Sequence, residues 1–361
     1  MKNELGKIAN IVRHPNMKKK TKLFTHNDLD GIGCEIIGRL AFEDIDVTIV
    51  KNPQDATQKV KEYIESREFV YYEHTYITDI SISNELASII DNYEVKLENK
   101  ELSNYFTLLD HHKTAEYLNK YKWCNVQEFS LLGKASGTDM FYSHLDKQGL
   151  FDGKRYVDVL DIFVEKVRRY DTWEWKTKYD DQESLKLNDL FFLLGREDFV
   201  QSIIGKIVHA RILSFSDGSW HQMFTASDEA VLHVDDKKKQ AYIESKKKEL
   251  FEMPLLGYNA GVVFAEQYIS ELGNSLAECY EDEVDFIVII DMGRNRISYR
   301  GIKDIDLGND VAKVFGGGGH AKASGSGFDK SIQQELFNKI FNTKARKGVL
   351  LNKIIDKITK K

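Results

Sequence analysis

One short stretch constrains the fold more than any other: the apolar run over residues 105–109 leads directly into Asp110, His111 and His112. Such a run predicts a buried strand, and folding alone requires neither a carboxylate nor two imidazoles at its end. Open α/β sheets bind their ligands outside the carboxyl ends of the strands. The stretch therefore favours an α/β sheet with a functional site at this strand end; a strand that simply runs into a polar loop is the alternative.

Acidic residues recur at the ends of other predicted elements. Two more strand-like runs, residues 22–25 and 76–78, lead into aspartates, and a predicted helix over 151–167 leads to another. Helical patterns separate the strands, and this alternation is typical of a parallel, doubly wound sheet. We therefore expect these side chains along one edge of the sheet. The full set is His26, Asp28, Asp30, Asp79, Asp110, His111, His112 and Asp171.

The chain has 361 residues, which is enough for two domains with separate cores. The first predicted domain covers residues 1–185 and holds the parallel sheet. A mostly helical connector over 186–254 joins it to a smaller α/β domain over 255–345, and a basic tail helix is expected over 346–361. The predicted fold class is thus α/β, with two domains of unequal size.

Composition argues against several classes of protein. No apolar run approaches the ~18 residues that a membrane-spanning helix needs, and the N-terminus lacks the apolar region of a signal peptide. Three separated cysteines argue against a disulfide framework and favour a reducing cytoplasm. A net charge of −6 argues against a protein that coats long nucleic acid. Long duplexes and membranes are therefore not expected as partners.

The acidic set favours a particular kind of metal site. Carboxylates predominate and cysteine is missing from the set, which suits Mn²⁺ or Mg²⁺ better than structural zinc, and the histidines favour Mn²⁺. Carboxylates that converge without a cation repel one another strongly. Asp28 and Asp30 can each address a different ion of a pair, and Asp79 is the best candidate to bridge the two ions. Two metals ~3.5–4 Å apart fit hydrolytic attack on phosphorus.

A glycine-rich segment is the second chemical feature. Four consecutive glycines, residues 316–319, precede His320. Glycine costs conformational entropy, and this cost is explained where backbone amides approach an anion; a flexible loop is the alternative. Ser136 starts a predicted helix, as a plain N-cap or as a phosphate contact. The candidate substrate-binding residues are His320, Arg300, Arg294, Gly317, Gly318, Gly319 and Ser136.

These motifs, in this order, resemble the DHH phosphoesterase superfamily, and specifically its oligoribonuclease branch with a DHHA1 substrate domain. The resemblance covers roughly residues 20–330. Its motifs are His26 to Gly31, Thr78-Asp79-Ile80, Asp110-His111-His112, Tyr170-Asp171, and Gly316 to His320 with Ala323-Ser324-Gly325.

The resemblance implies a role for each site residue. His26, Asp28 and Asp79 would hold one Mn²⁺, and the second would be held by Asp30, Asp79, His111 and Asp171. The catalytic residues would be Asp79, His112 and Asp110. His112 would face the substrate phosphate, and Asp110 would support the metal ligands without binding a metal itself. His320 and Arg300 would grip the phosphate of the terminal nucleotide across a cleft between the domains.

The function implied is a cytoplasmic, Mn²⁺-dependent phosphodiesterase that hydrolyses short oligoribonucleotides to nucleoside monophosphates. Two metal ions would activate a bridging water. A phosphatase for 3′-phosphoadenosine 5′-phosphate and a phosphodiesterase for cyclic nucleotides or linear dinucleotides are alternatives within the family. A non-catalytic nucleotide-binding regulator is the alternative from another class, and the intact acidic set speaks against it. Formation of a homodimer is left open, as are substrate length and cleavage polarity.

Overall fold

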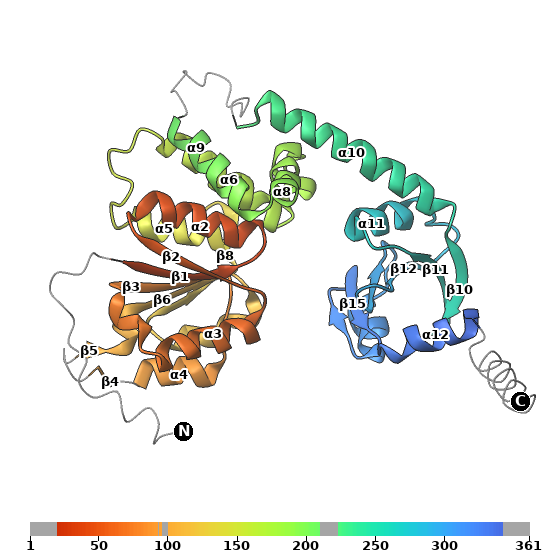
Figure 1. Ribbon diagram of the computed structural model, residues 1–361, viewed down its shortest axis with the longest axis horizontal. Helices are drawn as coiled ribbons and strands as arrows, with labels where there is room; N and C mark the ends of the chain where they lie inside the picture. Colours follow the sequence, from red (N-terminus) through yellow and green to blue (C-terminus); the bar gives the residue numbers. More distant parts are fainter. Residues whose placement is uncertain (1–19, 93, 96–99, 210–222, 342–361) are drawn as a thin grey trace, which may run out of the picture. The chain divides into compact units, whose positions relative to one another are not determined.

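The computed structural model describes residues 20–92, 94–95, 100–209 and 223–341. The tail helix expected over 346–361 lies outside the described residues. The chain divides into two compact units, Met1–Leu232 and His233–Lys361. Each unit is an α/β structure around its own sheet (Figure 1).

A five-stranded sheet in the order β2-β1-β3-β6-β7 forms the centre of the first unit. All neighbouring strands pair in parallel, and helices cover both faces (Figure 1). The doubly wound sheet predicted from the alternation of strands and helices is therefore confirmed. The strands are β1 (Thr21–His26), β2 (Ile45–Val50), β3 (His74–Thr78), β6 (Phe106–Asp110) and β7 (Cys124–Val126).

Two hydrophobic cores lie on the two faces of this sheet. Successive side chains of a strand point to opposite faces, so Leu23 and Leu109 join one core while Phe24 and Leu108 join the other. The first core is shared with α2 (Leu29–Ala41), α5 (Gly137–Asp146), α6 (Val157–Asp171), α8 (Gln182–Leu194) and α9 (Arg196–His209). The second core is shared with α3 (Pro53–Glu65) and α4 (Asn84–Asn92).

Short elements complete the first unit. They are η1 (Glu68–Tyr71), β4 (Glu94–Val95), β5 (Lys100–Glu101), η2 (Leu102–Tyr105), η3 (Lys113–Lys120), β8 (Phe129–Ser130), β9 (Gly133–Lys134) and α7 (Glu174–Thr177).

The helices α8 and α9 fall largely within the predicted connector, yet they pack as part of the first unit. Their buried residues Leu187, Leu190, Phe199 and Ile203 belong to the same core as α2 and α6. The long helix α10 (Ala226–Lys247) follows, and the division between the two units falls inside it. The domain boundaries at 185 and 254 stay a prediction.

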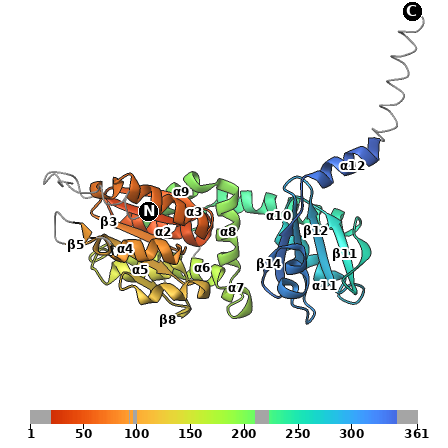
Figure 2. The ribbon, with the colours of Figure 1, turned by 90° about the horizontal axis from the view of Figure 1, so that it is seen from below.

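The second unit contains a six-stranded mixed sheet in the order β10-β11-β12-β13-β15-β14 (Figure 2). Among the described strands of this sheet, only β11 and β12 pair in parallel, and the helix α11 (Ile269–Cys279) connects them. β12 and β13 pair antiparallel and form a hairpin around residues 293–295. The strands are β10 (Phe251–Leu255), β11 (Tyr258–Phe264), β12 (Phe286–Asp291), β13 (Arg296–Arg300), β14 (Gly318–Gly319) and β15 (Ala323–Gly327), and the remaining helices are η4 (Leu307–Val311), η5 (Ala312–Phe315) and α12 (Ser331–Phe341).

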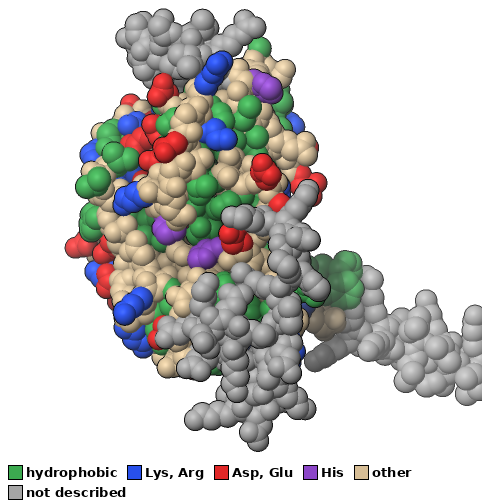
Figure 3. All heavy atoms as spheres, turned by 90° about the vertical axis from the view of Figure 1, so that its left-hand side faces the viewer, with side chains coloured by type: hydrophobic (Ala, Val, Ile, Leu, Met, Phe, Trp, Pro, Cys, Tyr) green, Lys and Arg blue, Asp and Glu red, His purple; other side chains and the backbone are tan. Residues whose placement is uncertain are grey.

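The surface carries charges of both signs. On the face in Figure 3, acidic, basic and hydrophobic side chains are scattered over the part of the surface that is not grey. This mixture agrees with the small net charge of −6. Within the described ranges, every helix is too short or too polar to cross a membrane.

Candidate metal centre

The carboxyl ends of three neighbouring strands bring the acidic set together. His26 ends β1, Asp79 directly follows β3, and Asp110 ends β6. Because these strands are adjacent and parallel in the order β1-β3-β6, their ends share one edge of the sheet. Asp171 is the last residue of α6. The described residues form three overlapping groups that could hold a metal ion.

The first group is formed by His26, Asp28 and Asp79. The Nδ1 atom of His26 lies 2.7 Å from Oδ2 of Asp28 and 3.9 Å from Oδ2 of Asp79. Asp28 is also the N-cap of α2, where it accepts a hydrogen bond from the amide of Gly31. A Cβ at Gly31 would lie 2.2 Å from the carbonyl oxygen of His26. This turn therefore requires glycine because it folds back against β1.

The second group is formed by Asp30, His111 and Asp171. The Nε2 atom of His111 lies 3.6 Å from Oδ2 of Asp30 and 3.5 Å from Oδ2 of Asp171. The same nitrogen is 3.2 Å from Oδ1 of Asp79. Burial lowers the pKa of His111, although the neighbouring carboxylates act to raise it. A neutral imidazole is the form that binds a metal.

Asp79 links the two groups, since Oδ2 faces His26 and Oδ1 faces His111. It is 1 % exposed and adopts a left-handed backbone conformation with φ of 56°. Burial, followed by the charges of Asp30 and Asp28, raises the pKa of Asp79 well above its usual range. The same causes raise that of Asp171. This crowding of carboxyl groups is a cost that a bound cation would relieve.

Three buried carboxylate oxygens in this region lack a hydrogen-bond partner among the described residues: Oδ2 of Asp79, of Asp110 and of Asp171. Buried polar atoms are normally paired. Oxygen-rich groups with one or two imidazoles suit Mn²⁺ or Mg²⁺. The donor set and the unpaired oxygens therefore fit a divalent cation.

The second group is held in place by the start of α5. The carboxylate of Asp30 accepts hydrogen bonds from the amides of Gly137 at 2.5 Å and Thr138 at 2.9 Å, and the hydroxyl of Thr138 donates to the Asp30 carbonyl. These three hydrogen bonds fix the position of Asp30 in the site. A Cβ at Gly137 would lie 2.4 Å from Cβ of Asp79. Sequence reasoning missed Gly137 and Thr138; a glycine directly after the predicted cap was the available signal.

Ser136 is buried and accepts a hydrogen bond from the amide of Asp139, so its interpretation as an N-cap is confirmed. The amides of the next two residues, on which a phosphate contact would rely, donate to Asp30 instead. The start of α5 thus positions a carboxylate of the site.

Asp110 orients His112. Oδ1 of Asp110 lies 2.7 Å from Nδ1 of His112 and also accepts hydrogen bonds from the amides of His111 and His112. This hydrogen bond raises the pKa of His112 to about 9. The side chain of His112 is 52 % exposed. His112 is thus an accessible imidazole, and with Asp79, Asp110 and His111 it forms the third group that could hold a metal ion.

Arg168 anchors the end of α6, one turn before Asp171. It is fully buried and pairs with Glu165 and Glu174, each at 2.7 Å. It also donates to the carbonyl of Lys134 on β9. Removing one partner of such a buried pair is strongly destabilising. Arg168 therefore ties the helix that carries Asp171 to the neighbouring hairpin.

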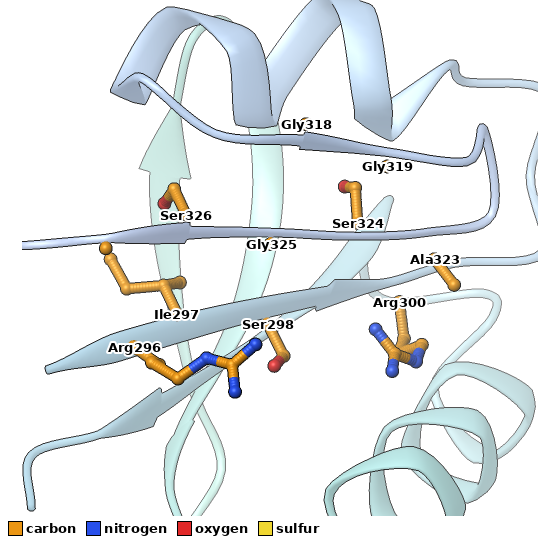
Figure 4. Close-up of a pocket in the computed structure, with 11 residues that line it drawn as sticks. Arg296, Ile297, Ser298, Arg300, Gly318, Gly319, Ala323, Ser324, Gly325 and Ser326 are labelled. Carbon is orange, nitrogen blue, oxygen red and sulfur yellow. The ribbon is translucent and has the colours of Figure 1, made fainter. Parts of the chain in front are cut away.

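The second unit contains a pocket of about 520 Å³ on β13, β14 and β15 (Figure 4). Three of the predicted substrate residues, Arg300, Gly318 and Gly319, line this pocket. Arg294 does not line it, because its guanidinium donates to Asp291 at 2.8 Å and to the carbonyl of Glu266.

His320 and Gly317 also lie outside the lining of the pocket. The side chain of His320 is exposed, and its amide donates to the carbonyl of Ala323. The glycine run is explained largely by packing within the sheet. A Cβ at Gly317 would lie 2.0 Å from the carbonyl oxygen of Gly325, and one at Gly319 would lie 2.7 Å from Cα of Ser324. A Cβ at Gly316 or at Gly318 would meet open space. Of these two glycines only Gly318 lines the pocket, so Gly318 offers bare backbone to it.

Comparison with known proteins reveals a curated relative with clear sequence identity. The oligoribonuclease NrnB of Bacillus subtilis (strain 168) is 36% identical over 320 residues, which covers 87% of this chain and 74% of that protein. No protein-family model matches the sequence.

The similar solved structures are more distant. A pGpG-specific phosphodiesterase, PggH from Vibrio cholerae, is 13% identical with a TM-score of 0.47, covering 90% of this chain and 98% of that one. RecJ in complex with Mn²⁺ from Thermus thermophilus is 14% identical with a TM-score of 0.46, covering 96% of this chain and 54% of that one. An uncharacterised protein from Helicobacter pylori G27 is 17% identical with a TM-score of 0.45, covering 90% of this chain and 100% of that one.

The first unit has a parallel sheet with aspartates and histidines at its carboxyl edge, and the second is a smaller α/β unit. This is the arrangement expected for a DHH phosphoesterase. The identity to the Bacillus protein shows the family itself. The chain belongs to the DHH/DHHA1 family of phosphoesterases, and it is therefore a hydrolase of phosphoester bonds.

Proposed function

We propose that this enzyme is a Mn²⁺-dependent phosphodiesterase that hydrolyses short oligoribonucleotides to nucleoside monophosphates. One observation carries the proposal: a single buried carboxylate, Asp79, directs one oxygen toward each of two adjacent groups of metal-competent side chains. Two adjacent cation sites are an arrangement that catalyses the hydrolysis of phosphodiesters. The relative from Bacillus, named an oligoribonuclease, supports the choice of substrate.

The proposed ligands follow the geometry of the two groups. His26 and Asp28, with Oδ2 of Asp79, would hold one ion. The other would be held by Asp30, His111 and Asp171 with Oδ1 of Asp79. Mn²⁺ is favoured over Mg²⁺ because imidazole nitrogens belong to both sets.

When bound, two such ions supply Lewis-acid activation of a water and neutralise charge on the phosphoryl oxygens. Asp110 fixes the orientation of His112, because it accepts the hydrogen bond from Nδ1. When the ring is protonated, Nε2 of His112 also carries a proton and can donate it in a hydrogen bond to a substrate oxygen. With a pKa of about 9, His112 is protonated at neutral pH and can hold a phosphoryl oxygen or protonate a leaving oxygen.

The pocket of the second unit is proposed to bind the anionic end of the substrate. Arg300 supplies a guanidinium there, and the bare backbone at Gly318 allows close approach. A contact of His320 with the same phosphate and a cleft between the two units stay predictions.

The proposal is tested by turnover on a substrate panel with the metal-stripped enzyme, reloaded with Mn²⁺ or Mg²⁺. The panel contains two- to seven-nucleotide RNAs, the matching DNAs, 3′-phosphoadenosine 5′-phosphate and cyclic mononucleotides. Stepwise release of mononucleotides from RNA, recovered with Mn²⁺, is the expected result. Turnover of the small nucleotides alone would replace the proposal with a phosphatase or cyclic-nucleotide phosphodiesterase, and silence on the whole panel with metal bound would support the regulator.

A further inference from the structure

The pocket of the second unit carries more positive charge than one phosphate requires. Among the described residues that line it, the charged ones are Arg296 and Arg300, and the others are serines, glycines, an alanine and an isoleucine. Carboxylates are missing from this lining. The volume of about 520 Å³ is in the range of small-molecule sites. The pocket is thus suited to a ligand that carries more than one anionic group.

Both arginines lie on one face of β13. Residues two apart along a strand point the same way, so Arg296, Ser298 and Arg300 form one row. Figure 4 shows Ser298 between the two guanidinium groups, with the side chain of Arg296 directed along the strand toward Ser298. Four residues of strand separate their Cα atoms by about 13 Å. The row therefore presents two separated cationic sites and a hydroxyl.

The strand beside this row offers bare backbone. Gly327 lies opposite Arg296, and Gly325 lies opposite Ser298 in the register of β13 with β15. Gly318 on β14 pairs in turn with Gly325. The surface next to the row therefore lacks side chains at these positions, so an extended ligand can lie along it without a steric clash.

The two arginines differ in how they are held. The guanidinium of Arg300 donates to the carbonyl of Tyr299 and to the hydroxyl of Ser270. A Cβ at Gly273 of α11 would lie 2.5 Å from Cγ of Arg300, so the helix leaves space for this side chain. Arg296 is exposed. In the part of the chain that the structure describes, no acidic side chain forms an ion pair with Arg296, so its donors are available to a ligand.

We infer that Arg296 binds a second phosphate of the substrate, beyond the phosphate that Arg300 holds, and thereby sets a preference for oligonucleotides with at least two phosphates. The inference rests on the proposed function and extends it to substrate length. A dinucleotide without terminal phosphates has one phosphate and can occupy one of the two positions. A trinucleotide has two phosphates and can occupy both.

The test is the affinity of the full chain for unlabelled di-, tri- and tetranucleotides without terminal phosphates, measured by calorimetry in EDTA at several salt concentrations. Arg296→Ala is compared with wild type, with Arg296→Lys, and with Lys330→Ala. The last variant removes an exposed charge of the same unit that does not line the pocket. The same four proteins, loaded with Mn²⁺, are then compared in KM for the di- and trinucleotide.

Arg296→Ala is expected to weaken binding of the tri- and tetranucleotide about tenfold, as for a lost charged hydrogen bond. Dinucleotide binding should stay within about twofold of wild type. The slope of log affinity against log salt should fall by about 0.7 for the longer ligands. Arg296→Lys should retain that slope, because it retains the charge, and KM should follow the affinities.

Equal losses for all three ligands would overturn the inference, because they indicate a single phosphate position. An unchanged affinity for the trinucleotide would overturn it as well, and so would an equal loss in Lys330→Ala. Binding is measured without metal, so a failure of the proposed catalytic function would appear only in the turnover measurements. The affinities would still test the role of Arg296.

Discussion

Replacing Asp79 by Asn tests the repulsion between carboxylates in the metal centre, both without metal and with Mn²⁺. Asparagine has nearly the same shape, tolerates the left-handed backbone at this position, and removes the charge. The candidate ligand atoms of His26, Asp28 and Asp79 lie within 4.8 Å of one another. Two negative charges at that distance repel by about 3 kcal/mol at an effective dielectric constant near 20. Without metal, Asp79→Asn should therefore be more stable than wild type by up to about 3 kcal/mol at neutral pH.

The stability that metal-free Asp79→Asn gains over wild type should increase with pH. Because the pKa of Asp79 is raised in the folded state, the wild type is most stable where this carboxyl is protonated in both states. It loses that stability as the pH rises above the ordinary range of an Asp. The advantage of Asp79→Asn should therefore be absent near pH 4 and grow toward pH 8.

Denaturant unfolding in EDTA, followed by tryptophan fluorescence, measures the difference in unfolding free energy between Asp79→Asn and wild type. The signal reports on the first unit, because all four tryptophans precede residue 233. With Mn²⁺ added, wild type should gain stability and Asp79→Asn should not, and turnover should fall at least about 100-fold. Asp146→Asn, an exposed change on α5, is the matched control. Equal stability of metal-free Asp79→Asn and wild type from pH 4 to 8 would refute the crowding, and an unchanged Mn²⁺ effect would refute the ligand role.

Three further predictions concern the same unit. Mn²⁺ binding should release protons and strengthen from pH 6 to pH 8, because Asp79 and Asp171 have raised pKa values; calorimetry in buffers of different ionisation enthalpy checks this, and a pH-independent affinity contradicts it. Burial lowers the pKa of His74 to about 4. Acidification to pH 5 should therefore reduce the unfolding free energy of the wild type by about 2 kcal/mol more than that of His74→Gln. Equal decreases in the two proteins would be inconsistent with a buried neutral imidazole. Gly137→Ala should destabilise the unit by about 1–3 kcal/mol and weaken Mn²⁺ binding, because the new Cβ meets Asp79. The control Gly205→Ala, in open space on α9, should stabilise by up to about 1 kcal/mol, and equal effects of the two changes would reject the steric argument.

The alternation of apolar runs and helical patterns was sufficient to predict the parallel sheet. Strands that are buried on both faces need continuous apolar residues, and such runs are visible in the sequence. The same reasoning predicted His26 and Asp110, which end their strands, and Asp79, which directly follows β3. Their convergence follows from topology, since parallel neighbours place their carboxyl ends on one edge. The family resemblance matched the same positions, and the identity to the Bacillus protein confirms the family.

The second unit was predicted less completely for a physical reason. A row of residues that lie opposite one another across strands depends on register, and register joins positions such as Arg296 and Gly327 that sequence spacing does not relate. Arg294 illustrates the same limit, because only the fold shows that Asp291 already binds its guanidinium.

The sequence alone thus determined the kinds of side chain at each strand end, and with them the class of chemistry. The tertiary structure decided which partner each of those side chains has. It placed the start of α5 against Asp30 and gave Asp79 a separate group for each oxygen. It also assigned the glycine run to sheet packing at Gly317 and Gly319. Local patterns carry the identity and spacing of residues, whereas contacts between distant segments arise only when the whole chain packs.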